Sequence, residues 1–148
     1  MASQGRIRDL GQSLDDRQFH AELVRVTPHL RAFARALCGC RDRADDLAQE
    51  TLLKAWSARQ SYQAGTNFKA WTFTILRNQF FSEGRRARFT GAYDPEMAER
   101  VLCCTGNQED SVELADLVRA LATLPDTHRD ALVLATIGDM AYEDIAAI

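Results

Sequence analysis

Apolar residues recur at three- and four-residue spacing along most of the chain, which is the pattern of helices with one apolar face. After a polar stretch from Met1 to Leu14, Asp15 or Asp16 is placed to cap a first helix. Because proline is tolerated in the first turn of a helix but not in its middle, Pro28 predicts a break there. A second segment would then start at Pro28. The residues expected to face inward in the two segments are Phe19, Leu23, Val26, Leu30, Phe33, Ala34 and Leu37, and Gly39 is expected to end the second.

The next helix is expected from Asp42 to about Ala58, and its acidic residues gather near one end. We place Asp42, Asp45 and Asp46 in its first turn, where the helix dipole favours negative charge. Four-residue spacing then brings acidic, amide and apolar side chains onto one exposed face. A strip that binds a protein partner and a merely solvated face both fit this pattern. The exposed strip comprises Asp46, Gln49, Glu50 and Leu53, and the positions expected in the core are Leu47, Thr51 and Ala55.

A loop from Arg59 to Thr66, which contains Gly65, separates this helix from the third one. Thr66 or Asn67 is placed to cap the third helix. Its two sides differ in chemistry. The residues expected to face inward are Phe68, Trp71, Thr72, Ile75, Leu76 and Phe80.

The opposite side of the third helix combines flat rings, an amide and guanidinium groups, with Glu83 as the single acid in the stretch. Rings of this kind stack on unpaired bases, and cations follow phosphates. The alternative is that the rings are further core and that the arginines complement the end of a helix. We favour the core for Trp71 and Phe80, and nucleic acid for Asn78, Phe81 and the arginines. The residues on this side are Lys69, Phe73, Arg77, Asn78, Phe81, Arg85, Arg86 and Arg88.

The apolar periodicity fades between Phe89 and Gln108, where Gly91, Pro95 and Gly106 predict a linker. A second helical unit is expected from Glu109. The sequence therefore predicts an all-α protein: a tail over residues 1–14, a helical domain over 15–88, a flexible linker over 89–108 and a second small helical domain over 109–148. In the second domain Leu124, Pro125 and Asp126 form a sharp turn, and the inward residues are Val112, Ala115, Val118, Leu121 or Ala122, Ala131, Leu132, Leu134 and Ala135.

Composition narrows the possible functions. The chain has 148 residues, of which 46% are hydrophobic and 26% charged, and these values are typical of a soluble globular protein. Because the formal net charge is -3, any contact with DNA has to come from a local basic patch. No apolar run approaches the roughly 20 residues that span a bilayer, and the N-terminus does not resemble a secretory signal. We expect a cytoplasmic protein that does not enter a membrane.

The cysteines and histidines do not form a metal or catalytic motif. Cys38, Cys40 and the adjacent pair Cys103 and Cys104 lack zinc-site spacing, so we expect plain thiols, with a redox role of the adjacent pair as a minor alternative. The histidines lie on separate predicted helices, and none stands beside an activated serine or cysteine. We therefore expect no catalytic site, no metal and no cofactor. The three histidines are His20, His29 and His128.

Two long motifs in order make the chain resemble the extracytoplasmic-function group of bacterial RNA polymerase sigma factors. RADDLAQETLLKAW resembles the helix with which that family binds core polymerase, and NFKAWTFTILRNQFFSEGRR resembles its promoter-melting helix. The longer stretch LCGCRDRADDLAQETLLKAW is most similar to the subgroup that runs the general stress response. LPDTHRDALVLATIGDMAYEDIAAI resembles the start of the family's fourth region, which contains a helix-turn-helix.

The resemblance assigns roles to individual residues. One set would meet the clamp helices of the largest polymerase subunit: Asp45, Asp46, Leu47, Gln49, Glu50, Leu53 and Trp56. A second set would contact the minus-ten element, where the loop from Ser61 to Asn67 would hold a flipped base and the helix behind it would open the duplex: Ser61, Tyr62, Asn67, Lys69, Trp71, Arg77, Asn78, Phe81, Arg85 and Arg86. The resemblance also implies control by an anti-sigma factor, so we expect a monomer or a heterodimer with that partner.

The chain differs from the family's pattern in one respect, at its C-terminal end. The helix that reads the minus-thirty-five element would follow Ile148. The second domain would then be a partial fourth region without its recognition helix, either because the chain is a trimmed piece of a longer protein, which we favour, or because it works without that contact. A different class of function also remains: a decoy, shaped like a sigma factor, that titrates an anti-sigma partner without reading DNA.

Overall fold

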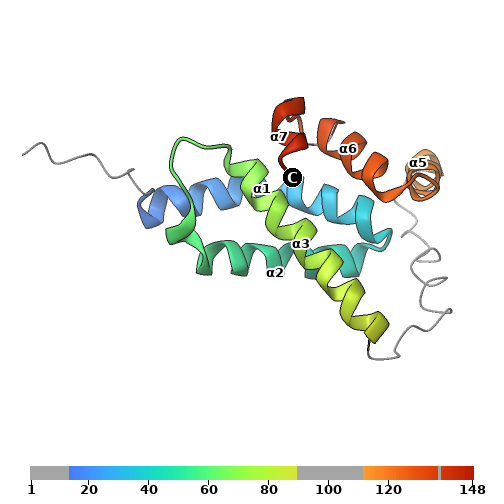
Figure 1. The fold of residues 1–148 in the computed structure, drawn as a ribbon, viewed down its shortest axis with the longest axis horizontal. Helices are drawn as coiled ribbons and strands as arrows, with labels where there is room; N and C mark the ends of the chain where they lie inside the picture. Colours follow the sequence, from blue (N-terminus) through green and yellow to red (C-terminus); the bar gives the residue numbers. More distant parts are fainter. Residues whose placement is uncertain (1–13, 90–111, 137) are drawn as a thin grey trace, which may run out of the picture.

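The computed structural model describes residues 14–89, 112–136 and 138–148, and within these ranges the chain forms helices and turns without a strand. Figure 1 shows α1 and α2 running side by side, with α3 crossing them and α6 and α7 along the edge of the bundle away from α2. The elements in chain order are α1 (Asp16–Cys38), α2 (Arg41–Ser57), the short 3₁₀ helix η1 (Arg59–Ser61), α3 (Phe68–Phe89), α5 (Val112–Ala122), α6 (Asp126–Thr136) and α7 (Tyr142–Ala146).

Helix α1 runs without a break through Pro28, so the two segments expected from the sequence are one helix. Its start is as predicted: the Asp15 side chain accepts a hydrogen bond from the backbone N–H of Gln18, and the Gln18 side chain accepts one from Asp15. Proline in a helix costs about 3 kcal/mol because it removes one backbone hydrogen bond. The carbonyl that loses its donor belongs to Val24, a residue on the exposed side of the helix. Burial of the apolar stripe on both sides of the proline keeps the helix continuous.

Gly39 ends α1 in the left-handed conformation, with φ at 67°, and its N–H bonds to the carbonyl of Arg35, as the sequence indicated. Helix α2 then begins at Arg41, so of the three acids expected in its first turn only Asp42 lies there. The three positions of α2 expected in the core, Leu47, Thr51 and Ala55, are buried as predicted. The residues that α2 buries are Ala44, Leu47, Ala48, Thr51 and Ala55.

Helix α3 starts after Asn67, whose side-chain Oδ1 accepts a hydrogen bond from the N–H of Ala70 at 3.1 Å. Its core side holds Phe68, Thr72 and Leu76, and Phe73 joins them with no exposed surface. The assignment of Phe73 to the nucleic-acid side was therefore wrong. Its ring lies 5.0 Å from that of Phe33 on α1, because a helix that crosses two others buries a wider face than a single stripe.

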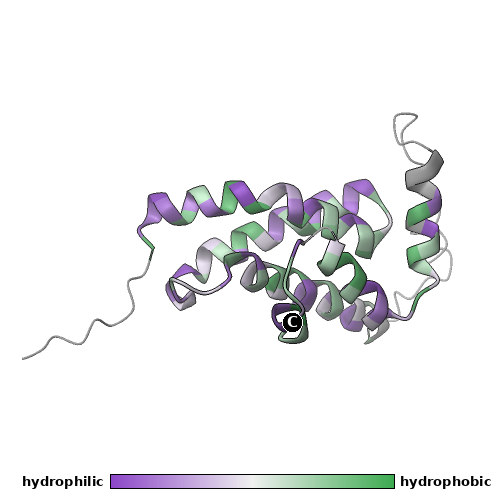
Figure 2. Cartoon of the chain, turned by 90° about the horizontal axis from the view of Figure 1, so that it is seen from above, coloured by the Kyte–Doolittle hydropathy of each residue, from purple (hydrophilic) through white to green (hydrophobic). Residues whose placement is uncertain are grey.

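Helices α5 to α7 pack against the first three helices, so the core is continuous across both halves of the chain. Figure 2 shows hydrophobic and hydrophilic residues alternating along the described helices. Leu121, not Ala122, is buried in α5, and α6 buries Val133 and Leu134, whereas Ala131 and Leu132 are exposed. The prediction of which side of α6 faces the core was therefore wrong for Ala131 and Leu132 and right for Leu134. The predicted linker from 89 to 108 lies outside the described residues except for Phe89, which ends α3.

Candidate functional site

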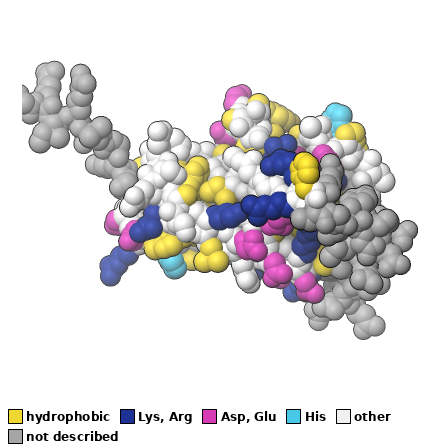
Figure 3. Space-filling view, turned by 60° about the horizontal axis from the view of Figure 1, so that its bottom comes forward, with side chains coloured by type: hydrophobic (Ala, Val, Ile, Leu, Met, Phe, Trp, Pro, Cys, Tyr) yellow, Lys and Arg dark blue, Asp and Glu magenta, His cyan; other side chains and the backbone are white. Residues whose placement is uncertain are grey.

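The exposed face of α2 carries most of the strip expected to bind a partner. Asp46, Gln49 and Glu50 are exposed, and beside them Leu53 is 68% exposed, which is unusual for a leucine on a packed helix. Figure 3 shows acidic side chains gathered below a row of lysines and arginines on the side where α2 lies. An exposed apolar side chain on the same helix face as two acids and an amide suits a partner with an apolar pocket and a basic rim.

The structure places the remaining members of the predicted α2 set below the surface to differing degrees. Leu47 is buried, so its side chain supports the helix from inside. Asp45 is half-buried and faces Arg31 of α1, with the carboxylate Oδ1 3.5 Å from the guanidinium Nε. Trp56 is half-buried too, with its ring edge against Phe19 and with Arg59 lying 4.8 Å from the ring centroid.

Gln79 of α3 links the acidic face of α2 to the helix behind it, a role that was not predicted from the sequence. Its side chain is 4% exposed and donates hydrogen bonds to the carboxylates of Glu50 on α2 and Glu83 on α3. A buried amide that meets a carboxylate holds that carboxylate in one orientation. Gln79 therefore positions Glu50 at the edge of the exposed face.

The loop between η1 and α3 rests on a cluster of aromatic rings. Tyr62 is buried, its ring packs against Phe19, Phe68 and Trp71, and its hydroxyl donates to the carbonyl of Thr66 at 2.6 Å. This bond closes the loop. Of the predicted DNA-binding residues in this part, Ser61 and Asn67 are exposed, Trp71 is half-buried and Tyr62 supports the loop from below.

The outer side of α3 is accessible mainly in its C-terminal half. Asn78, Arg85 and Arg86 are exposed. Phe81 is half-buried, with its ring centroid 5.4 Å from that of Phe80 and the guanidinium of Arg77 4.9 Å from it. The side chain of Arg88 lies outside the part of the chain that the structure describes.

The N-terminal half of the same side is in contact with the C-terminal helices. The Nε of Arg77 donates to Oδ2 of Asp130 on α6 at 3.0 Å, and its Nη1 lies 3.3 Å from the carbonyl oxygen of Ile148. Lys69 donates from Nζ to the carbonyl of Gly138 at 2.9 Å. Burial raises the pKa of the Asp130 carboxyl above its ordinary value of 3.8, although Arg77 opposes this.

Asp130 is the second residue that sequence reasoning missed. A signal was present, because Asp130 lies three and four residues before Val133 and Leu134 and therefore shares their buried face. A single acid on an apolar face requires a cationic partner elsewhere in the fold. The sequence does not say which arginine supplies it.

Comparison with known proteins decides the family. Residues 23–90 match the family model of sigma-70 region 2, which covers the bundle of α1 to α3. The chain is 42% identical over 127 residues to the ECF RNA polymerase sigma factor EcfG of Rhodopseudomonas palustris, covering 86% of this chain and 70% of that protein. The chain belongs to the ECF sigma factor family. Such proteins are transcription initiation factors and not enzymes.

Two further relatives agree with this assignment. The ECF RNA polymerase sigma factor SigE of Mycolicibacterium smegmatis is 38% identical over 132 residues, which cover 85% of this chain and 51% of that protein. Among solved structures, the sigma factor RpoE in complex with the anti-sigma factor NepR from Bartonella quintana is 40% identical, with a TM-score of 0.73 over 88% of this chain and 82% of that one. The all-α fold predicted from the sequence is thereby confirmed.

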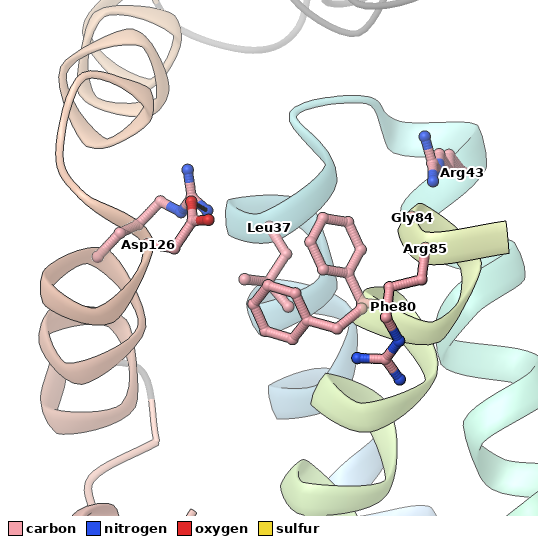
Figure 4. A pocket seen from close by; sticks show the side chains of 8 residues that line it. Leu37, Arg43, Phe80, Gly84, Arg85 and Asp126 are labelled. Carbon is pink, nitrogen blue, oxygen red and sulfur yellow. Dashed lines mark hydrogen bonds and ion pairs between the residues drawn. The ribbon is translucent and has the colours of Figure 1, made fainter. Parts of the chain in front are cut away.

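A cavity of about 520 Å³ separates α6 from the C-terminal half of α3 in this sigma factor. Figure 4 shows Asp126 on one side of it and Leu37 and Phe80 on the other. The contacts of Lys69 and Arg77 with the C-terminal helices lie along the N-terminal half of α3, away from this cavity. The residues that line the cavity are Leu37, Arg43, Phe80, Phe81, Gly84, Arg85, Asp126 and Arg129.

The described thiols of the sigma factor lie where α1 meets α2. Burial raises the pKa of the Cys38 thiol to about 11, whereas Cys40 is half-exposed. Within the described ranges no three His, Cys, Asp or Glu side chains gather as a metal site would require. None of the described helices combines the length and the apolar character needed to cross a membrane. Cys103 and Cys104 lie outside the described residues.

Proposed function

We propose that this ECF sigma factor binds core RNA polymerase through the exposed face of α2 and melts the minus-ten element of its promoters with α3 and the loop before it. The observation that carries the proposal is that one three-helix bundle presents both faces. Leu53 is exposed on α2 with Asp46 and Glu50, while Asn78, Arg85 and Arg86 are exposed on α3. Gln79 joins the two helices through Glu50.

The chemistry of the two faces fits these separate partners. Acidic and amide groups on the same face as an exposed leucine suit a partner helix with a basic, partly apolar surface. Cations on α3 suit phosphates, and Phe81, together with an amide, suits the rings and edges of unpaired bases. The loop from 61 to 67, closed by the bond from Tyr62 to Thr66, supplies a rigid rim for a base that leaves the stack.

Control by an anti-sigma factor is part of the proposal. It is supported by the similarity to RpoE, which was solved in complex with the anti-sigma factor NepR. A role in a general stress response is supported by the stretch from Leu37 to Trp56, whose sequence resembles that subgroup. The C-terminal helices would belong to a fourth region, on the resemblance of residues 124–148.

Polymerase binding is tested by replacing two acids of the α2 face. The Asp46→Ala, Glu50→Ala variant should bind core polymerase at least tenfold more weakly, measured by titration of a fluorescently labelled sigma factor. The matched control is Asp116→Ala, Glu143→Ala, which changes the net charge equally at two exposed acids on α5 and α7. Equal affinity of the two double variants would show that the α2 face is not where polymerase binds.

Promoter melting is tested at Asn78, because its side chain is exposed on the outer side of α3. Asn78→Ala should leave core binding unchanged and lower the yield of open complex, measured by permanganate footprinting of a promoter selected with the parent holoenzyme. His20→Ala, at an exposed position of α1 outside both proposed faces, serves as the control. If the holoenzyme bound no promoter at all while still binding an anti-sigma factor, the protein would be the decoy considered above.

A further inference from the structure

The cavity of about 520 Å³ between α6 and the C-terminal half of α3 combines cationic and aromatic walls. Its volume lies within the roughly 300–1,000 Å³ of sites that hold a small molecule. We infer that this cavity binds a free nucleotide, whose phosphates pair with the arginines and whose base packs on the phenylalanine rings. The inference goes beyond the proposed function, and binding of a nucleotide can be measured without polymerase or DNA.

The wall of the cavity carries an excess of positive charge. Arg43 of α2, Arg85 of α3 and Arg129 of α6 line it, and Asp126 supplies the one carboxylate among the described lining residues. This excess is local, because the chain as a whole has a formal net charge of -3. Guanidinium groups bind phosphate oxygens in pairs, through two parallel hydrogen bonds. The ligand is therefore expected to be an anion with several oxygens.

Arg129 has unused hydrogen-bonding capacity at this wall. Its side chain is 12% exposed, and its Nη2 donates to the exposed carboxylate of Asp126, three residues earlier. Its Nε is buried without an acceptor in the described part of the chain. Arg119 of α5 forms the same kind of pair with Asp116, but its side chain is 68% exposed. Because water screens Arg129 less, an anion in the cavity gains more from Arg129 than from a surface cation such as Arg119.

Flat apolar surface lies beside these charges. Phe80 and Phe81 are half-buried, with their ring centroids 5.4 Å apart, and Leu37 next to them is buried. The guanidinium of Arg43 lies 5.9 Å from the centroid of Phe80, and Figure 4 shows Arg43 and Arg85 on the same side of the cavity as Phe80. Nucleotide bases stack on rings and on guanidinium planes. Inorganic polyphosphate would leave the rings unused and an uncharged molecule would leave the arginines unused, whereas a nucleotide uses both.

Gly84 keeps the cavity open on the side of α3. It lies inside the helix, and a Cβ atom added to it meets nothing within 4 Å. Packing therefore does not require a glycine there, although glycine in a helix interior is less stable than alanine. A larger side chain at this position would fill the cavity without displacing the helix.

A bound nucleotide would compete with promoter DNA. Phe81 and Arg85 line the cavity and also belong to the residues proposed to contact the minus-ten element. Two ligands that need the same side chains weaken each other's binding by the same factor. This consequence rests on the proposed function, whereas the binding of the nucleotide does not.

The test titrates ATP into the full chain by isothermal titration calorimetry, without divalent cations. Adenosine and inorganic tripolyphosphate are titrated separately, as the two halves of ATP. Gly84→Leu fills the cavity, and Gly84→Ala is its control because a single methyl group leaves room. Arg129→Gln removes one lining cation, and Arg119→Gln is the matched control at the exposed pair on α5. Circular dichroism checks the helix content of each variant.

We expect ATP to bind the parent chain about tenfold more tightly than either adenosine or tripolyphosphate, because only ATP uses both walls. Gly84→Leu and Arg129→Gln should each weaken ATP binding about tenfold, whereas Gly84→Ala and Arg119→Gln should keep the parental affinity. If Arg129→Gln loses helix, the comparison of Gly84→Leu with Gly84→Ala decides, because neither changes a charge.

Several results would overturn the inference. Equal affinity of Gly84→Leu and Gly84→Ala for ATP would place the nucleotide outside the cavity. Tripolyphosphate that bound as tightly as ATP would reduce the cavity to a patch that holds any polyanion.

Absence of ATP binding to the parent chain would also overturn the inference, whatever the result with DNA. A fluorescein-labelled single-stranded DNA oligonucleotide that still bound, and bound more weakly to Gly84→Leu, would then assign the cavity to the promoter strand and support the proposed function alone. ATP binding that follows the cavity variants, in a chain that does not bind the oligonucleotide, would support the inference and count against the proposed function.

Discussion

Replacing Phe73 by alanine tests whether this ring belongs to the core or to a nucleic-acid surface. The ring has no exposed surface, its centroid lies 5.0 Å from that of Phe33, and the turn at Gly138 packs against its edge. Truncation of a buried phenylalanine to alanine costs about 3–5 kcal/mol of the free energy of unfolding, through lost burial and the cavity left behind. A domain of this size has roughly 5–15 kcal/mol in total.

The loss should be visible in thermal unfolding followed by far-ultraviolet circular dichroism. For about 150 residues, each kcal/mol lowers Tm by roughly 2–4 °C, so Phe73→Ala should lower Tm by about 10 °C. Phe73→Leu keeps most of the volume and should cost only about 1 kcal/mol. The matched control is Phe81→Ala on the same helix. Its ring is half-buried, so we expect a loss of about 1 kcal/mol from the contact with Phe80.

The reverse pattern would refute this reasoning. If Phe73 stacked on bases, its replacement would leave Tm unchanged and weaken binding of single-stranded DNA by about 1–3 kcal/mol for each base lost. We expect that loss of affinity for Phe81→Ala instead. An unchanged Tm for Phe73→Ala would mean that the ring is not the packed core residue that the structure shows.

Three further predictions concern single residues. Because burial raises the pKa of Cys38 to about 11, iodoacetamide at pH 8 should modify Cys40 well before Cys38 in peptide maps, and equal rates would contradict the burial. Because burial raises the folded-state pKa of Asp130 above 3.8, its contribution to the free energy of unfolding is fully present below pH 3.8 and is lost as pH rises through the folded pKa. The stability of the parent chain relative to Asp130→Asn should therefore fall with rising pH in that window, measured by urea titrations, and a rise would reverse the assigned cause. Gly39→Ala should lower the free energy of unfolding by about 1–2 kcal/mol because φ is 67° there, whereas Gly84→Ala, inside α3 with nothing within 4 Å of the added Cβ, should raise it by about 0.5–1 kcal/mol.

The helices could be predicted from the sequence because their signals are local. Asp15 and Asn67 cap the helices that they precede, and Gly39 ends α1, since each needs only its own neighbours. Pro28 shows where local reasoning fails. Its cost is local, but the burial that outweighs it comes from α2 and α3, which no window around the proline contains. The inward face of α6 failed for the same reason, because helices distant in sequence decide which side is covered.

The same distinction between local signals and long-range contacts applies to the candidate site. Exposed positions such as Leu53 and Asn78 were correctly placed outside by periodicity. The pairing of Arg77 with Asp130, 53 residues away, could not be found this way, because a pattern of spacing identifies a charged side chain but not its partner across the fold. The amide of Gln79 was missed because polar residues at helical spacing look alike whether they face solvent or a buried carboxylate.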